Sequence, residues 1–305
     1  MKTRTIGSLN VSEVGVGCNN FGGRLDQERT NVVVHSALEN GINFFDTADV
    51  YGDWQSEVLL GRALAGRRDD AVIATKFGIT RDGAFSGAPD YIRSAVEASL
   101  TRLGTDHIDL LQYHFPDGVT PIAETIGAMQ ELVAAGKVRE IGCSNFSEEQ
   151  LREAHVAAGS GPRFVSVQSQ YSLLYRAPET DGVLATCREL NIAFLPYYPL
   201  ANGLLTGKVR PGEPLPEGTR LSLMPPERAA HWTGDAIMEQ VGRLLEVSEA
   251  FQTPLLSAAF SWLLSHPEVA SVIAGASNDG QIAANAAAAI ELSAAHIAAL
   301  SAATA

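Results

Sequence analysis

Four residues of this 305-residue chain have types and positions that suit proton transfer. Asp46 and Tyr51 lie in FDTADVYG, Lys76 lies in AVIATKFG, and His114 follows LLQY. Free tyrosine has a pKa near ~10, which is too high for ready proton donation at pH 7. A neighbouring lysine cation would lower that pKa, a carboxylate would keep the lysine charged, and a histidine would hydrogen-bond a substrate oxygen. Together these residues predict protonation of the alkoxide that forms when a carbonyl is reduced.

Each of these residues, taken singly, also has a purely structural interpretation. A strand-end aspartate such as Asp46 often caps a turn, a single loop tyrosine is usually packing, and a single histidine is more often a hydrogen-bonded core residue. Lys76 is harder to explain in this way, because it closes an apolar run and a buried lysine needs a partner to keep its charge. The prediction therefore depends on all four residues lying together.

The elements that must position these residues alternate regularly along the chain. Short apolar strands separated by helical segments predict a parallel sheet, and eight such units close into a (β/α)8 TIM barrel. A doubly wound sheet is the alternative topology. The predicted strands are 14–18, 42–47, 71–77, 108–114, 138–145, 164–171, 191–198 and 270–276.

We expect a single α/β domain over residues 1–305. It would have an N-terminal β-hairpin plug at 5–13, an extra helix at 235–251 before the seventh barrel helix at 254–265, and a C-terminal helical tail. Residues 200–234 are rich in proline and glycine and have no clear period. Long loops in compact domains are often functional, so we expect this loop to cover a cofactor or substrate.

Composition excludes several classes of function. The chain has 35 acidic and 22 basic residues, a formal net charge of -13, which disfavours nucleic-acid binding. Three cysteines without CxxC spacing indicate neither a disulfide framework nor a zinc site, and no other metal motif is present. No signal peptide and no apolar run long enough to cross a membrane is apparent. We therefore expect a reduced, cytoplasmic protein without a membrane partner.

Carbonyl reduction requires a hydride donor, which must be a cofactor because no side chain donates hydride. The usual dinucleotide fingerprint is absent, because GVGCNNFG has Asn20 where GxGxxG needs its third glycine. GLLTGK is one residue too short between its glycines for a phosphate-binding P-loop. The polar strand ends of a barrel would have to hold the cofactor instead.

The sequence resembles the aldo-keto reductase family, in the branch that contains bacterial reductases and potassium-channel β-subunits. The resemblance runs from about residue 3 to about residue 290. It implies a TIM barrel that binds NADP(H) without a Rossmann motif and interconverts carbonyls and alcohols. The segments that carry it are FDTADVYG, VIATKFG, LLQYHFPD, AAGKVREIGCSNFS, VQSQYSLL, YYPLANGLLTGK and SVIAGASNDGQIAAN.

By that resemblance Tyr51 would be the general acid, Lys76 would lower its pKa, Asp46 would pair with Lys76, and His114 would orient the carbonyl. The resemblance also assigns the cofactor contacts. They are Ser144, Asn145 and Gln168 for the carboxamide, Tyr197 for stacking on the nicotinamide, Pro199, Leu200, Gly203 and Leu205 along the pyrophosphate, and Gly275, Ser277, Gln281 and Asn285 towards the adenosine.

Two positions depart from the family pattern in a way that concerns cofactor choice. Gly275 and Gln281 stand where many reductases have lysine and arginine for the 2′-phosphate of NADP(H). Lys208 and Arg220 in the long loop would have to supply that charge. We expect NADP(H) to be favoured, with NAD(H) possible.

Five aromatic residues are candidates for the substrate pocket, with plain packing as the alternative. If they line it, they favour aromatic or extended apolar aldehydes. The small-molecule substrate would be a carbonyl or an alcohol, and the oligomeric state is open. Two other functions remain: a sugar or hydroxysteroid dehydrogenase working in the oxidative direction, and a slow redox sensor or regulatory subunit. The five aromatic residues are Phe21, Trp54, Phe77, Phe115 and Trp232.

Overall fold

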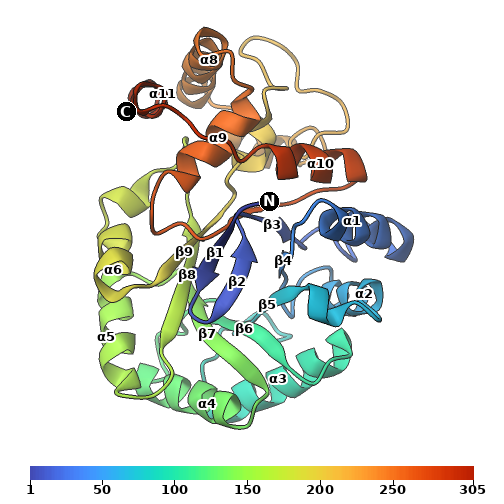
Figure 1. Ribbon diagram of the computed structural model, residues 1–305, viewed down its shortest axis with the longest axis vertical. Coiled ribbons are helices and arrows are strands. Elements are labelled where there is room, and N and C mark those ends of the chain that lie inside the picture. The colour runs from blue at the N-terminus through green and yellow to red at the C-terminus, as the bar shows by residue number, and fades with distance from the viewer.

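The computed structural model describes all 305 residues and confirms the predicted barrel. Eight parallel strands lie side by side in one sheet, and the helices surround it (Figure 1). Along the chain the barrel strands are β3 (Val14–Gly17), β4 (Phe44–Asp46), β5 (Val72–Phe77), β6 (Ile108–Tyr113), β7 (Val138–Ser144), β8 (Phe164–Gln170), β9 (Ala193–Tyr197) and β10 (Val272–Ala274).

The sheet follows chain order except that β10 pairs with β3, which brings the two ends of the sheet together. Between β9 and the segment before β10, Phe194 N–H donates to Glu268 O at 2.7 Å and Ala270 N–H donates to Phe194 O at 3.1 Å. The sheet is therefore a nearly closed barrel, and the doubly wound alternative is wrong.

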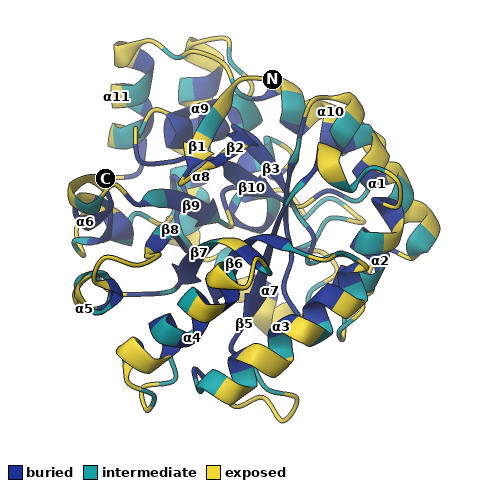
Figure 2. Cartoon of the chain, turned by 60° about the horizontal axis from the view of Figure 1, so that its bottom comes forward, coloured by how far each residue is buried: buried dark blue, intermediate teal, exposed yellow.

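The helices turn buried faces to the barrel and exposed faces to solvent (Figure 2). Their termini follow local sequence rules. Ser147 and Gln150 form a reciprocal capping box, and Gly104 ends a helix in the left-handed conformation at φ 64°. The helices are α1 (Gln27–Glu39), α2 (Ser56–Ala63), α3 (Pro89–Leu103), α4 (Ile122–Ala134), α5 (Glu148–Ala158), α6 (Val183–Leu190), α7 (Pro226–Trp232), α8 (Asp235–Ala250), α9 (Leu255–Leu264), α10 (Asp279–Ala287) and α11 (Ala294–Ala303), with 3₁₀ turns η1 (Arg68–Asp70), η2 (Ala177–Glu179) and η3 (Ala201–Thr206).

A hairpin of β1 (Thr3–Ile6) and β2 (Leu9–Ser12) covers the amino-terminal end of the barrel. Gly7 supplies the positive φ of 56° that its tight turn requires. Ile6 and Leu9 belong to one buried cluster with Phe44, Leu110 and Leu195 of the barrel strands. The hairpin thus closes this end of the barrel with apolar side chains and leaves the opposite end for a site.

The second half of the chain differs in detail from the sequence prediction. The loop 200–234 contains η3 and α7, which no hydrophobic period had indicated. Residues 178–190 do not form one continuous helix, because Gly182, whose φ is 87°, separates η2 from α6. The extra helix α8 precedes α9 as expected, and α11 forms the tail. None of the helices is both long enough and apolar enough to span a bilayer.

α2, which follows the segment that carries Tyr51 in the chain, packs against the end of α3 at Gly61. A Cβ at Gly61 would lie 2.2 Å from the backbone oxygen of Leu103. We predict that Gly61→Ala lowers the free energy of unfolding by about 2 kcal/mol, because backbone must move to relieve the overlap. Urea denaturation followed by circular dichroism measures the change.

Gly127→Ala in α4 is the matched control. No atom lies within 4 Å of a Cβ at that position, so the substitution should stabilise by about 0.5–1 kcal/mol through helix propensity alone. Equal effects of the two substitutions would show that the α2–α3 contact does not depend on a glycine.

Candidate active site

A buried ion pair lies at the carboxyl end of the barrel strands. Lys76 on β5 is fully buried, and its Nζ lies 2.8 and 2.7 Å from the two carboxylate oxygens of Asp46 on β4. The same ammonium donates to Thr47 O at 2.8 Å and lies 3.5 Å from the Tyr51 hydroxyl oxygen. Burial by itself would lower the pKa of Lys76, but Asp46 and Tyr51 together outweigh it and hold that pKa above its ordinary value. Lys76 therefore stays a cation beside Tyr51.

The structure corrects the expected balance at Tyr51. Lys76 does lower the pKa of the Tyr51 hydroxyl, but burial raises it more, so the net shift is upward. The Lys76 Nζ also lies 5.0 Å from the centre of the Tyr51 ring. Tyr51 is thus a neutral phenol at pH 7, and the Lys76 cation lies where it would stabilise the phenolate.

His114 follows β6 and faces Tyr51 edge-on, with 6.0 Å between the ring centres. Burial and the Lys76 charge lower the pKa of His114 to about 3, so the imidazole is neutral at pH 7. Its Nδ1 is buried and has no hydrogen-bond partner in the protein. A neutral histidine can donate one N–H, which suits hydrogen bonding to a carbonyl oxygen.

Two buried amides complete the surroundings of Asp46. Gln168 on β8 donates its Nε2 to Asp46 Oδ1 at 2.8 Å, and Gln112 on β6 donates to the same oxygen at 3.1 Å. Sequence reasoning assigned Gln168 only to the cofactor and missed Gln112. The sequence did contain a pattern that places Gln112 at the site. Gln112 lies two residues before His114, and because side chains alternate across a strand, both point to the same face.

The predicted nicotinamide contacts Ser144, Asn145 and Tyr197 form one hydrogen-bonded group. The Tyr197 hydroxyl donates to Asn145 Oδ1 at 2.9 Å, and Asn145 Nδ2 donates to His114 O at 3.1 Å and to Ser144 Oγ at 3.0 Å. Asn145 adopts a left-handed conformation with φ 60°, which asparagine tolerates better than most residues. These contacts fix the group beside the Tyr51–His114 pair.

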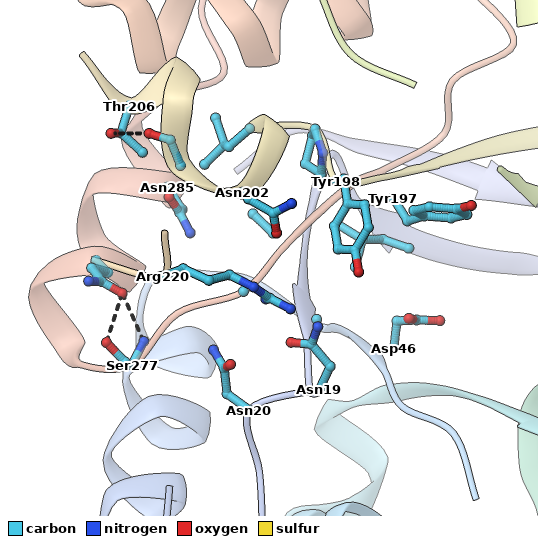
Figure 3. A pocket seen from close by; sticks show the side chains of 18 of the residues that line it. Asn19, Asn20, Asp46, Tyr197, Tyr198, Asn202, Thr206, Arg220, Ser277 and Asn285 are labelled. Carbon is cyan, nitrogen blue, oxygen red and sulfur yellow. Dashed lines mark hydrogen bonds between the residues drawn. The ribbon is translucent and has the colours of Figure 1, made fainter. Parts of the chain in front are cut away.

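One cavity of about 540 Å³ is lined by most of these residues and extends from Asp46 to Ser277 (Figure 3). Leu205 and Lys76 do not line it, because both side chains are fully buried behind its wall. The structure brings most of the predicted cofactor residues to this wall. Those that line the cavity are Ser144, Asn145, Gln168, Tyr197, Pro199, Leu200, Gly203, Lys208, Arg220, Gly275, Ser277, Gln281 and Asn285.

Only one of the five candidate aromatic residues lines the cavity. Phe115 does so, and it stacks on His114 at 5.0 Å between ring centres. Phe85, which is half exposed and was not among the candidate residues, also stacks on Phe115, with 5.3 Å between the ring centres. The two rings form an aromatic wall beside His114.

The other four aromatic residues were wrongly expected in the pocket. Phe21 is fully buried in the core, and Phe77 is buried and stacks on Tyr113. Trp54 lies between the guanidinium groups of Arg81 and Arg102, which hold the indole by cation–π contacts. Trp232 packs edge-on against Tyr198. Each of these four rings packs against other side chains outside the cavity wall, which is the packing alternative stated for them from the sequence.

Three cations line the cavity and none has an acidic partner. They are Lys208, Arg220 and Arg24, the last of which was missed from the sequence. None of the three forms an ion pair, although acidic residues outnumber basic ones in the chain. The only acidic residue of the cavity wall is Asp46, which is bound to Lys76. The cavity is therefore locally positive in an acidic protein.

This cavity fits a nicotinamide dinucleotide. Its volume lies in the range of small-molecule sites, and its unpaired cations suit phosphates. Asn202, in a left-handed turn of η3 at φ 57°, has a buried Oδ1 without a partner and lines the same space. Ser144, Asn145 and Gln168 offer amide and hydroxyl groups at the end near Tyr51. The chain has no cluster of three or more residues suited to binding a metal ion.

Comparisons with known proteins agree with this geometry. A profile described as the aldo/keto reductase family matches residues 13–305. A probable aldo-keto reductase 1 of Glycine max is 37% identical over 85% of this chain and 75% of its own length. The fission yeast protein named aldo-keto reductase yakc [NADP(+)] is 35% identical over 86% of this chain and 79% of its own.

Two solved structures are also similar. The holo form of an aldo-keto reductase from Bacillus halodurans has a TM-score of 0.80 and 33% identity, covering 99% of this chain and 96% of that one. A glycerol dehydrogenase from Gluconobacter oxydans has a TM-score of 0.84 and 29% identity, covering 99% and 94%. Both likenesses extend over the whole barrel.

A second buried carboxyl, Asp49, lies two residues before Tyr51. Its Oδ1 accepts from Val50 N–H at 2.7 Å, and its Oδ2 is buried without a partner. The fully buried Glu57 is close by and is held by Thr75 and Arg102. Burial, with repulsion from Glu57, raises the pKa of Asp49 from 3.8 to about 7.

We predict that Asp49→Asn changes how stability depends on pH. The folded protein binds the Asp49 proton more tightly than the unfolded chain, so this group lowers the free energy of unfolding progressively between about pH 4 and pH 7. The asparagine variant lacks that loss and should be more stable than wild type by about 2 kcal/mol at pH 8, with little gain at pH 4. Urea denaturation at a series of pH values measures it.

Asp53→Asn removes an exposed carboxylate from the same turn and is the control for formal charge. If Asp49→Asn and wild type gave parallel stability curves between pH 4 and pH 8, the buried carboxyl would not be protonated in the folded state as described.

Proposed function

Because this chain belongs to the aldo/keto reductase family, whose members are NAD(P)-dependent oxidoreductases acting on carbonyl and alcohol groups, we propose that it reduces an aldehyde or ketone to the alcohol with Tyr51 as proton donor. The observation that carries this proposal is the single ammonium of Lys76, which contacts both Asp46 and the Tyr51 hydroxyl beside a neutral His114. When bound, the nicotinamide supplies the hydride.

The residues act on the oxygen of the substrate. His114, uncharged and lining the cavity, hydrogen-bonds the carbonyl oxygen and places it near Tyr51. Negative charge that develops on this oxygen makes it a strong base, which takes the proton of the Tyr51 hydroxyl. Lys76 stabilises the resulting phenolate at short range in a buried site, where charge interactions are strong. In the reverse direction the same phenolate accepts the proton of an alcohol.

For the cofactor we propose a preference for NADP(H) over NAD(H). Lys208 lies two residues after Thr206, which is at the same end of the cavity as Asn285 and Ser277 (Figure 3). Lys208 lines that cavity without an acidic partner. A free ammonium at the adenosine end favours an additional phosphate there. The relative named for NADP(+) supports this preference.

For the substrate we propose an aromatic or apolar aldehyde, taken in the reductive direction. The wall of Phe115 and Phe85 beside His114 supports it, because aromatic side chains favour stacked rings. Oxidation of a polyol, in the manner of the similar glycerol dehydrogenase, is the alternative direction and substrate class.

Tyr51→Phe tests the function. We predict a fall in kcat of at least about 10²-fold, since the variant lacks the proton donor, while the Kd for NADPH changes less than about twofold. Turnover is measured with benzaldehyde and with glyceraldehyde, and wild type should have the higher kcat/KM for benzaldehyde. Turnover of the variant at the wild-type rate would remove Tyr51 from the mechanism.

Lys208→Glu tests the cofactor preference. We expect the Kd for NADPH to rise by about tenfold or more and that for NADH to change by less than about threefold, because only NADPH carries the 2′-phosphate. Fluorescence titration gives both values. Arg210→Glu makes the same charge change at an exposed position of the loop 200–234 outside the cavity, and it serves as the control. Equal losses for both cofactors would separate Lys208 from the 2′-phosphate.

A further inference from the structure

The turn that carries Tyr51 also carries a carboxyl group that the proposed reaction does not use. This β4–α2 turn comprises residues 47–55, and Asp49 lies in it outside the cavity wall, with only 1% of its surface exposed. Its Oδ1 accepts one hydrogen bond from Val50 N–H, whereas its Oδ2 is buried without a partner. A buried carboxylate normally accepts several hydrogen bonds or pairs with a cation, so this geometry fits a carboxyl group that keeps its proton.

A second buried acid lies close to Asp49 and takes the donors of this region. Glu57 on α2 is fully buried, and it accepts from Thr75 Oγ1 at 2.6 Å and from Arg102 Nε at 2.7 Å. Arg102 of α3 therefore forms its ion pair with Glu57 and makes no hydrogen bond to Asp49. Two buried carboxylates in one place repel each other, which favours the protonated form of the acid that has fewer donors.

The other polar groups that face Asp49 are also bound elsewhere. The Lys76 ammonium of β5 is held by both carboxylate oxygens of Asp46. The Tyr91 hydroxyl of α3 donates to Ile79 O at 3.0 Å. Burial, with repulsion from the neighbouring acid on α2, accordingly raises the pKa of Asp49 to about 7. Contacts and charges thus agree that this carboxyl group is uncharged below neutral pH.

The backbone couples Asp49 to the proposed proton donor. Asp49 N–H donates to Lys76 O at 3.2 Å, and Tyr51 N–H donates to Ala48 O at 3.2 Å, so both residues belong to one hydrogen-bonded turn above β5. An ionised Asp49 would be a buried charge without donors, and movement of the turn that admits water would relieve this cost. Tyr51 would move with the turn and lose its 3.5 Å contact with the Lys76 ammonium.

We propose that Asp49 is a positioning residue that holds the β4–α2 turn in its active arrangement only while it carries its proton, so that turnover falls as Asp49 ionises. The inference rests on the proposed function, because it requires Tyr51 to be the proton donor. Activity would then be full at low pH and would be lost as the pH rises through about 7. Ionisation of Tyr51 itself does not explain such a fall, because burial holds its pKa above the ordinary value near ~10.

The experiment compares Asp49→Asn with wild type in kcat/KM for benzaldehyde at saturating NADPH between pH 6 and pH 9. Asparagine has the shape of the protonated acid but cannot ionise. The ratio of variant to wild type should rise by about tenfold or more over this range, because only wild type loses its protonated form. Ionisations common to both proteins cancel in this ratio. The Kd of the variant for NADPH should stay within about twofold of wild type at each pH.

Glu57→Gln is a second variant, and it tests the charge relation without altering Asp49. It removes the repelling carboxylate, so the fall in kcat/KM should move to lower pH by about one pH unit. Asp53→Asn removes an exposed carboxylate from the same turn and is the matched control, whose pH profile should coincide with that of wild type.

A ratio for Asp49→Asn that stays constant from pH 6 to pH 9 would overturn the role of Asp49. So would a fall in Glu57→Gln that keeps its wild-type midpoint or moves to higher pH. These failures are distinct from failure of the proposed function, which would appear as wild-type turnover by Tyr51→Phe whatever the profile of Asp49→Asn.

Discussion

The burial of one lysine charge is the constraint on which the site depends. Lys76 has no exposed surface, and a buried ammonium is stable only when its hydrogen-bond donors and its charge are satisfied. Asp46 at the end of β4 and Thr47 O directly after it meet that need, and Gln112 and Gln168 in turn donate to Asp46 from β6 and β8. Four strands of the barrel thus converge on one charge pair. The remaining contact of the ammonium is the hydroxyl of Tyr51, the residue proposed to react.

That arrangement explains why the barrel is necessary. Residues 46, 76, 112 and 168 are distant in sequence, and only a closed parallel sheet sets their strand ends in one ring. Alternation along each strand then decides which side chains point inward. The hairpin of β1 and β2 covers the other end of the barrel with Ile6 and Leu9, which belong to one apolar cluster with residues of the barrel strands.

The sequence predicts a residue's position only where its neighbours form a recognisable pattern. Strand ends are marked by a change from apolar to polar residues, so the fold and the positions of Asp46, Lys76 and His114 at one end could be predicted. Bulky aromatic residues carry no such signal. Trp54 was expected at the pocket, but its neighbours Arg81 and Arg102, brought together by folding, hold it elsewhere. Arg24 and Phe85 lie in turns, whose conformation a hydrophobic period cannot indicate.

The net shift of the Tyr51 pKa could not be predicted from the sequence either. Burial raises this pKa and Lys76 lowers it, and only the structure shows that burial prevails.

The charge of the cavity is opposite in sign to the net charge of the chain. An acidic chain disfavours any polyanion at long range, yet long-range fields are screened within about 8–10 Å in physiological salt, whereas contacts inside a partly closed cavity are screened much less. A dinucleotide therefore responds to the local charges, and here these are Arg24, Lys208 and Arg220 without acidic partners. Elsewhere the chain does pair its arginines, as in the Arg93–Glu131 and Arg152–Glu189 contacts on the surface. The absence of such partners in the cavity leaves the charge of these three side chains available to a bound anion, and this makes it possible for an acidic protein to hold an anionic cofactor without a glycine-rich phosphate loop.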